Sequence, residues 1–299
     1  MQVPVKPKML SSCLKIIGGK RKLREKLYSM FPKDIETFYE PFAGSLAVLI
    51  GHEPWNREYV SDTNPFSMGF FRVLQTQPEA FWGLYEIERL KLSKEYFEKC
   101  KQDLTELQNH RDSDYRQLRL ALSYYFVNKL CMNGIVRFNS KGICNSSYCG
   151  QTTGRGLFTR AWFDQIVTRI KDVSFNNVDY RVLLRHANHV EKPNAFVKAA
   201  LGRDLPGPET RFIMADPPYT GPGVYTEYWS SRFKEPEQEQ LAELLAKSKA
   251  RWLLTINDCE FIRGLYAGFN IHEHEVGYSC SQSSKGRGNH KELIITNFG

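Results

Sequence analysis

The sequence lacks the features that would place it in a membrane or a secretory pathway. Its 299 residues contain no apolar run of membrane-spanning length, and no apolar signal segment follows the first lysines. The seven cysteines include no C-x-x-C pair, and their number is odd. These absences argue against a zinc knuckle and against a disulfide framework. We therefore expect a soluble, cytoplasmic protein with reduced thiols and no bound metal.

Acidic residues are absent from two long stretches of the chain. Residues 1–24 and 115–163 contain no Asp or Glu, although the whole chain has 33 acidic residues against 41 Lys and Arg. Aromatic and amide side chains are interleaved with the basic residues of these stretches, and the net charge is +8. The pattern favours a polyanionic partner over an acidic metabolite, with a solvated basic face as the alternative.

The dinucleotide fingerprint G-x-G-x-x-G is also missing, although the early part of the chain otherwise reads as a nucleotide-binding βαβ unit. A predicted strand ending at Tyr39 leads into a small-residue turn at 40–45 and an expected helix at 46–50. The next strand ends in Asp62, 18 residues after Gly44, about where a carboxylate binds ribose hydroxyls. Without a pyrophosphate motif, an adenosine-containing cofactor such as S-adenosylmethionine fits best.

The stretch most informative about chemistry is Asp216-Pro217-Pro218-Tyr219. It follows an apolar run, 212–215, that is typical of a buried parallel strand, which the prolines cannot extend. Ligands bind at the carboxyl ends of such strands. Asp216 and the Pro217 carbonyl can each accept one N–H of an exocyclic amine on a planar base, and Tyr219 can stack on that base. The alternative is a proline-stiffened turn with Tyr219 as ordinary packing.

The segment 66–150 interrupts the α/β pattern. It contains a predicted helix at 117–130 and then a run at 128–142 that is rich in amides and glycine turns and free of acids. Such residues suit contacts with base edges and phosphates. We interpret 66–150 as an inserted helical target-recognition domain within a catalytic domain formed by 1–65 and 151–299.

The α/β pattern resumes beyond the insertion. A strand is predicted at 173–178, a loop without periodicity at 186–210, and a terminal hairpin from 269–276 and 292–298. The fold class expected for the chain is therefore α/β.

Taken together, these motifs resemble those of the Dam-type DNA adenine-N6 methyltransferases, which are α-group enzymes of the D12 class. The likeness covers nearly the whole chain, through 14–20, 38–45, 62–65, 179–180 and 216–219 in the family's order. It implies a Rossmann-like S-adenosylmethionine-dependent methyltransferase sheet that acts on adenine N6 in double-stranded DNA, with base flipping. It further implies a bacterial or phage-type intracellular protein, monomeric or weakly dimeric on DNA.

The resemblance also implies roles for individual residues. Catalysis is expected from Asp216, Pro217, Pro218 and Tyr219. Cofactor contacts are expected from Ile16, Gly18, Gly19, Lys20, Glu40, Pro41, Phe42, Ala43, Gly44, Ser45, Asp62, Asn64, Asp179, Tyr180 and Asp216. DNA contacts are expected from Lys15, Lys129, Met132, Asn133, Gly134, Arg137, Asn139, Lys141 and Asn145, and no metal ligand is expected.

Four positions depart from the family pattern. Ile16 replaces a usual aromatic residue, and Leu46 replaces the second glycine of the main cofactor loop. Met132 and Ser147 stand where the best-known members have Tyr and Pro, which argues against a strict GATC specificity.

Two rival functions fit the same residues. Cytosine-N4 methylation uses the same geometry, because any exocyclic amine can be presented in this way, but aspartate before Pro-Pro-Tyr favours adenine. A catalytically inactive DNA-binding relative is the other rival, and the intact acid and aromatic ring of the motif argue against it.

Overall fold

The computed structural model describes residues 9–16, 18–107, 113–149, 156–189, 207–219, 227–228, 231–277 and 289–299. By its contacts the chain divides into two compact units. The helical unit comprises Met1–Phe31, Ala43–Pro54 and Asn64–Asn177, and the sheet unit comprises Pro32–Phe42, Trp55–Thr63 and Val178–Gly299. Contacts therefore assign more of the chain to the helical unit than the predicted insertion 66–150 does, and the functional domain boundaries remain a prediction.

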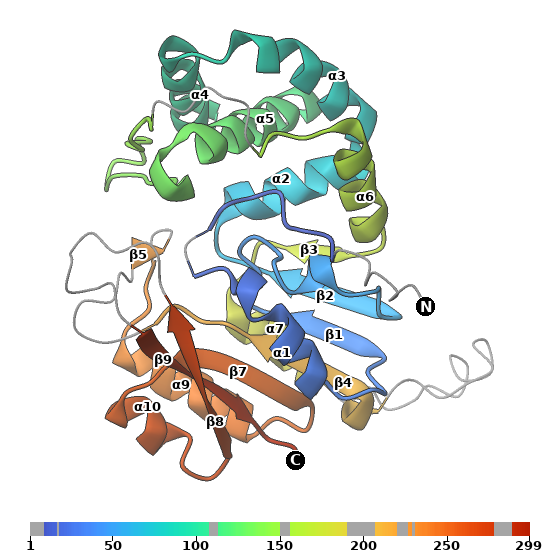
Figure 1. The fold of residues 1–299 in the computed structure, drawn as a ribbon, viewed down its shortest axis with the longest axis vertical. Helices are drawn as coiled ribbons and strands as arrows, with labels where there is room; N and C mark the ends of the chain where they lie inside the picture. Colours follow the sequence, from blue (N-terminus) through green and yellow to red (C-terminus); the bar gives the residue numbers. More distant parts are fainter. Residues whose placement is uncertain are drawn as a thin grey trace, which may run out of the picture. The chain divides into compact units, whose positions relative to one another are not determined.

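The sheet is mixed and mostly parallel (Figure 1). Its parallel pairs join β1 (Thr37–Glu40) to β2 (Arg57–Ser61) and to β4 (Arg211–Ala215), and β4 to β7 (Arg251–Asn257). The antiparallel hairpin β8 (Asn270–Gly277) and β9 (Asn289–Thr296) follows, with β9 beside β7. Including β3 (Ser174–Asn176), the order is β3-β2-β1-β4-β7-β9-β8. The α/β expectation and the terminal hairpin are both confirmed.

The central strand β4 is apolar because both faces of the sheet are covered there. Its residues 212–215 are all 0% exposed, as expected for a continuous apolar run in a parallel sheet. The register pairs Ile213 with Tyr39 on β1 and with Trp252 on β7. The core of this unit also contains residues of α7 (Tyr180–Asn188), α9 (Glu235–Ala246) and α10 (Glu260–Leu265). A separate antiparallel pair is formed by β5 (Glu227–Tyr228) and β6 (Ser231–Arg232).

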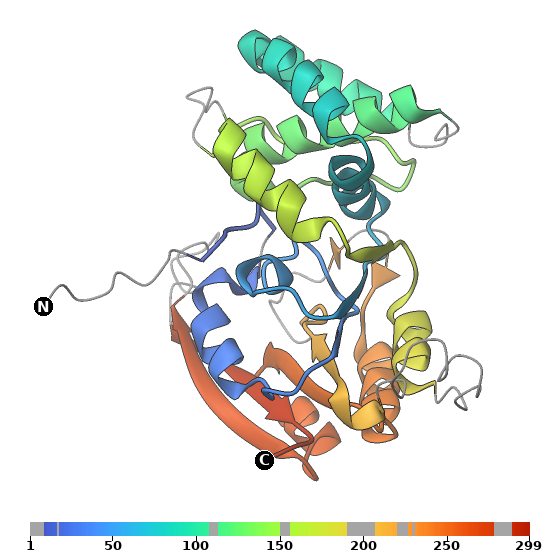
Figure 2. The ribbon, with the colours of Figure 1, turned by 90° about the vertical axis from the view of Figure 1, so that its right-hand side faces the viewer.

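The helical unit is organised around α5 (Asp114–Leu130), which confirms the helix predicted at 117–130. Every residue of α5 from 118 to 130 is buried, because helices surround it. Figure 2 shows α5 and its neighbour α4 side by side. The other helices of the unit are α1 (Arg24–Met30), α2 (Pro65–Thr76), α3 (Pro78–Glu88), α4 (Lys94–Leu107) and α6 (Arg160–Ile170), with short 3-10 turns η1 (Lys20–Lys22), η2 (Leu49–Gly51), η3 (Arg89–Lys91) and η4 (Met132–Gly134).

The helix expected at 46–50 was wrong. The chain turns there instead, with the Leu46 N–H donating to the Ala43 carbonyl at 2.6 Å, and only the short η2 follows. Gly44 and Leu46 both have positive φ, 47° and 57°, which an α-helix does not allow. A leucine in this conformation costs about 1–2 kcal/mol. Complete burial of the side chain, worth about 1.5–3 kcal/mol, offsets that cost.

The loop expected at 186–210 was also partly wrong, because α7 continues to Asn188 before the chain leaves it. Residues 190–206 lie outside the described residues. The 3-10 turn η5 (Pro208–Thr210) lies directly before β4.

Candidate functional site

Three acids lie at the carboxyl ends of adjacent parallel strands in the sheet unit. Glu40 ends β1, Asp62 follows β2 and Asp216 follows β4. The register places Glu40 opposite Val60, and Tyr39 opposite Ile213, so these three strand ends share one edge of the sheet. This is the edge at which open α/β sheets bind ligands. The structure therefore brings the predicted ribose-binding and catalytic acids to the same edge.

Asp216 is held by a buried hydroxyl from the next strand. Thr255 of β7 is 0% exposed, and its Oγ1 donates to Asp216 Oδ1 at 2.8 Å. Asp216 itself is partly exposed. A hydrogen bond from a neutral donor to a carboxylate stabilises its negative charge and restrains its rotamer. The acid is thus oriented by the sheet, not only by its own turn.

The second fixed point of the Pro-Pro-Tyr segment comes from α9. The Nε2 of Gln238 donates to the Pro218 carbonyl at 2.8 Å, and Gln238 is 0% exposed. Pro217 is buried, and Tyr219 packs partly buried against the core of the sheet unit. The tetrapeptide predicted to be catalytic is therefore anchored at two points at the end of β4.

Sequence reasoning missed both anchors, although each carries a signal. Thr255 is a hydroxyl within the apolar run of β7, and Gln238 lies on the same helical face as the buried Leu241 and Leu245. A polar residue on an apolar strand or stripe needs a partner when it is buried. That rule would have pointed to both residues.

Asp179 and Tyr180 have structural roles at the start of α7. Asp179 caps the helix by accepting from the Arg181 N–H at 2.9 Å, and it pairs with the Arg181 guanidinium at 2.8 Å. Tyr180 is only 4% exposed, and its ring stacks on Phe42 with centroids 5.1 Å apart. Its hydroxyl donates to the Glu237 carbonyl at 3.3 Å. Of the two, only Asp179 has a side chain accessible enough to meet a ligand.

In the helical unit, the predicted amino-terminal motif lies against the loop that follows β1. A Cβ atom added to Gly19 would lie 3.2 Å from the Ile16 carbonyl oxygen and 3.8 Å from Ser45 Oγ. A Cβ added to Gly44 would lie 3.8 Å from Cδ1 of Ile16. The Ser12 hydroxyl donates to the Ser45 carbonyl. These two glycine-containing stretches thus form one closely packed backbone cradle.

Two further predicted cofactor residues bond to nearby backbone. Lys20 is 5% exposed, and its Nζ donates to the Gly18 carbonyl at 3.0 Å. Asn64 caps α2, where its Oδ1 accepts from the backbone N–H groups of Phe66 and Ser67 at 3.0 and 3.2 Å. Both side chains shape the backbone around them.

The predicted DNA-reading segment is an irregular hairpin, residues 131–149. Cys131 bridges to Tyr148 and Phe138 bridges to Cys144, both antiparallel. Six of the residues on this hairpin that are predicted to contact DNA are exposed: Met132, Asn133, Arg137, Asn139, Lys141 and Asn145. The hairpin therefore presents amide and basic side chains to solvent on a fixed backbone.

Lys15 is attached to this hairpin through Asn128. Asn128 is 0% exposed, its Oδ1 accepts from the Lys15 N–H at 2.9 Å, and its Nδ2 donates to the carbonyls of Lys15 at 2.7 Å and of Gly134 at 3.0 Å. Gly134 has φ +73°, and a Cβ there would lie 2.4 Å from Cβ of Lys15. Only glycine fits this position. The structure thus brings exposed Lys15 together with the predicted DNA-reading hairpin.

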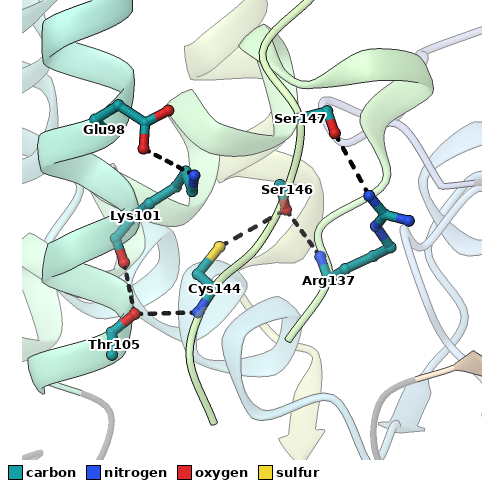
Figure 3. Close-up of polar contacts among 7 residues, drawn as sticks. All are labelled: Glu98, Lys101, Thr105, Arg137, Cys144, Ser146 and Ser147. Atoms are coloured by element: carbon teal, nitrogen blue, oxygen red, sulfur yellow. Dashed lines mark hydrogen bonds and ion pairs between the residues drawn. The ribbon is translucent and has the colours of Figure 1, made fainter. Parts of the chain in front are cut away.

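Figure 3 shows how the hairpin is connected to α4. Ser146 Oγ accepts from the Arg137 N–H at 2.9 Å, and Thr105 Oγ1 on α4 accepts from the Cys144 N–H at 3.1 Å. The Arg137 guanidinium reaches Ser147 Oγ at 3.5 Å. Arg137 is consequently exposed, but its backbone is restrained.

The position of Lys129 does not support its predicted DNA contact. It is only 7% exposed, and its Nζ lies over the rings of Tyr125 and Trp162 at 5.3 and 5.5 Å from their centroids. Burial lowers the pKa of Lys129 from 10.5 to about 8, with a smaller opposing effect from Cys13 and a small additional lowering from Lys15. Lys129 therefore belongs to the interior of the helical unit.

This lowered pKa predicts a pH-dependent stability. Below about pH 8 the lysine is charged in both the folded and the unfolded chain, and its burial is unfavourable. Between about pH 8 and 10.5 the folded chain loses this proton first, so the free energy of unfolding rises with pH. Relative to Lys129→Met, the wild type should gain roughly 3 kcal/mol over this range.

Denaturant unfolding of both proteins at several pH values measures this difference. Lys141→Met, which removes an exposed lysine from the same unit, is the matched control. A difference between wild type and Lys129→Met that stays constant from pH 7 to 10.5 would contradict the assignment of Lys129 to the interior.

Two negative findings apply to the described parts of the chain. In them, no cluster of three or more His, Cys, Asp or Glu side chains is arranged to hold a metal ion. Equally, the helices in those parts include none with the length and apolar character needed to span a bilayer.

Comparison with known proteins identifies the family of the chain. The profile of the family described as D12 class N6 adenine-specific DNA methyltransferase matches residues 17–197 and 204–280. The chain is 24% identical to the type II methyltransferase M.CviBI of Paramecium bursaria Chlorella virus NC1A, over 94% of this chain and 97% of the relative. It is 25% identical to M1.LlaDCHI of Lactococcus lactis subsp. cremoris, over 94% and 93% of the two chains.

A relative named DNA adenine methylase, from Vibrio cholerae serotype O1, is 24% identical over 94% of each chain. The family match spans most of the chain, including the hairpin 131–149 and the Asp-Pro-Pro-Tyr motif. This chain therefore belongs to the D12 class of N6 adenine-specific DNA methyltransferases.

Proposed function

We propose that Asp216 and the Pro217 carbonyl hold the exocyclic amine of a flipped adenine while S-adenosylmethionine donates the methyl group. The observation that carries this assignment is the acid at the carboxyl end of β4, with Oδ1 held by the buried Thr255 hydroxyl at 2.8 Å. Because that bond restrains the carboxylate, Asp216 presents its acceptor oxygens in a fixed direction. A preorganised acceptor of this kind is effective in catalysis because it does not reorient during the reaction.

The residues of the chain act on the amine in a defined way. Asp216 and the Pro217 carbonyl accept its two N–H groups, which turns the nitrogen lone pair away from them and stabilises the positive charge that develops on nitrogen. Tyr219 stacks on the flipped base. S-adenosylmethionine, when bound, supplies an electrophilic methyl group. The rest of the rate enhancement comes from proximity and orientation.

The residues present suit this cofactor. Asp62 and Glu40 provide carboxylates at the same sheet edge as Asp216, and a carboxylate after the second strand is suited to ribose hydroxyls. In the helical unit, glycine at position 19 permits a close backbone turn, because a Cβ there would lie 3.2 Å from the Ile16 carbonyl oxygen. We assign these stretches, with Asp179, to cofactor binding.

Asp62→Ala tests the cofactor assignment. The variant should bind S-adenosylmethionine about ten- to a hundredfold more weakly, since hydrogen bonds to a charged group contribute about 1.5–3 kcal/mol. Its affinity for DNA should change little, because a carboxylate does not attract a polyanion. Calorimetry with each ligand measures both effects. Asp172→Ala, which removes an exposed acid, is the control, and an unchanged cofactor affinity in Asp62→Ala would return Asp62 to the role of a turn residue.

We assign DNA recognition to the hairpin 131–149 and to Lys15, as part of a target-recognition domain at 66–150. Lys15, Arg137 and Lys141 are exposed and basic, and the Asn128 bonds fix Lys15 relative to the hairpin. Asn133 and Asn145 supply exposed amides for base edges, whereas Asn139 contributes its Nδ2 only, because its Oδ1 accepts from the backbone N–H groups of Lys141 and Ile143 at 3.0 Å. Met132 and Ser147 on the same hairpin favour a site other than strict GATC. The protein acts on double-stranded DNA as a monomer or a weak dimer.

The target site can be mapped in cells. DNA from cells that express the protein, and lack other adenine methylation, is sequenced with modification-sensitive reads. A single short motif methylated at adenine is the expected result. Methylation spread over adenines without a common motif would contradict the recognition role of the hairpin.

A further inference from the structure

The tetrapeptide Asp216-Pro217-Pro218-Tyr219 is held from outside at two points, one on each side of the Pro217 carbonyl. Thr255 fixes the Asp216 carboxylate, and the Gln238 amide fixes the carbonyl of Pro218. Each proline ring restricts φ to about −65°. Few torsions remain between the two anchors. The direction of the Pro217 carbonyl therefore depends on both of them.

The surroundings of Gln238 indicate that its hydrogen bond to the Pro218 carbonyl is important. Gln238 is 0% exposed, and its Oε1 has no hydrogen-bond partner among the described residues. A buried acceptor without a partner costs about 1–3 kcal/mol. The neighbouring buried positions of α9, Leu241 and Leu245, are apolar, so a leucine at 238 would avoid that cost. What glutamine supplies here, and leucine cannot, is the N–H donated to Pro218 at 2.8 Å.

We propose that Gln238 is a positioning residue for methyl transfer. By holding the Pro218 carbonyl, its amide keeps the Pro217 carbonyl and the Tyr219 ring in the orientation that receives the adenine amine. Gln238 acts through the backbone of the tetrapeptide and does not itself contact the base. This inference rests on the proposed function of Asp216 and Pro217.

Two variants separate a lost donor from a lost side chain. Gln238→Leu removes the bond, and the single-turnover rate of methyl transfer at saturating DNA and S-adenosylmethionine should fall at least about tenfold at every pH. Gln238→Glu places a carboxylate against the Pro218 carbonyl at alkaline pH, where it cannot donate. When protonated it donates as glutamine does, and burial raises the pKa of such a carboxyl. Its rate relative to wild type should therefore rise as pH falls from about 8 to about 6.

Gln240→Glu is the matched control, because it makes the same charge change at an exposed position of α9, where Oε1 accepts from Arg181. It should follow the wild-type pH profile. Circular dichroism at each pH confirms that rates are compared between folded proteins, and DNA affinity should change less than about twofold. If Gln238→Leu does not fold, the pH profile of Gln238→Glu carries the test alone.

Each outcome decides the proposal. A wild-type rate in folded Gln238→Leu, or a Gln238→Glu profile parallel to that of wild type, would overturn the positioning role and leave the proposed function standing. No transfer by the wild type would overturn the proposed function and this inference together. A relative rate that rises with falling pH in Gln238→Glu, but not in Gln240→Glu, supports the positioning role.

Discussion

Asp216→Ala is expected to lose about 100-fold or more of the methyl-transfer rate while keeping its fold. Removing a preorganised, charge-stabilising acceptor from an active site typically costs this much. The variant also leaves the buried Thr255 hydroxyl without its acceptor, so unfolding should become easier by about 1–3 kcal/mol. Single-turnover rates at saturating substrates, with thermal unfolding of the same samples, separate the two effects.

The control for Asp216→Ala is an acid at a neighbouring strand end. Asp258 follows β7 and pairs with Arg263 at 2.6 Å, so Asp258→Ala removes a carboxylate from a structural ion pair. It should transfer methyl groups at close to the wild-type rate. Near-normal turnover in Asp216→Ala would contradict the assignment of this acid.

Arg137→Ala is expected to weaken binding to the target site by roughly 1–3 kcal/mol and to relax the sequence preference at one base pair. The guanidinium is exposed on a hairpin whose backbone is fixed by Ser146 at 2.9 Å, so it can donate two bonds to guanine O6 and N7 with little loss of freedom. Methylation of a library of single-base variants of the mapped site measures the change in preference.

Lys141→Ala is the matched comparison on the same hairpin. A lysine is a point charge on a flexible stem and discriminates bases poorly. Its loss should weaken binding to all DNA sequences alike. The slope of the logarithm of the binding constant against the logarithm of salt concentration should become shallower by about one unit. If Arg137→Ala also lowers the methylation of every sequence equally, Arg137 contacts phosphate and the base-reading role of the hairpin is wrong.

The elements that sequence reasoning predicted well are those fixed by local periodicity. The apolar run 212–215 is typical of a buried strand, and the segment 117–130 repeats apolar residues at helical spacing, as α5 confirms. The turn at Leu46 was missed because its φ of +57° is unusual for leucine and depends on burial by the rest of the unit. Tertiary packing determines the backbone conformation of Leu46, and no local sequence pattern predicts it.

The site shows the same division. Motif spacing was enough to place Asp62 and Asp216 each at the end of a strand, and the parallel register brings both ends to one sheet edge. It was not enough for Lys129, which lies in a basic stretch and was predicted to contact DNA, whereas the structure buries it. Gln238 escaped notice because it lies distant in sequence from the motif whose carbonyl it holds. The sequence can mark such a side chain as one that needs a partner, but only the fold shows which distant group the partner is.

The central claim is that the site around Asp216 methylates adenine N6, and product analysis tests it most directly. Unmethylated DNA is incubated with S-adenosylmethionine carrying an isotope-labelled methyl group and with wild type or Asp216→Ala, and the digested nucleosides are separated by mass spectrometry. Label should appear in N6-methyladenine with the wild type and fall about 100-fold or more with the variant. Label in N4-methylcytosine, or equal label in N6-methyladenine with both proteins, would contradict the claim.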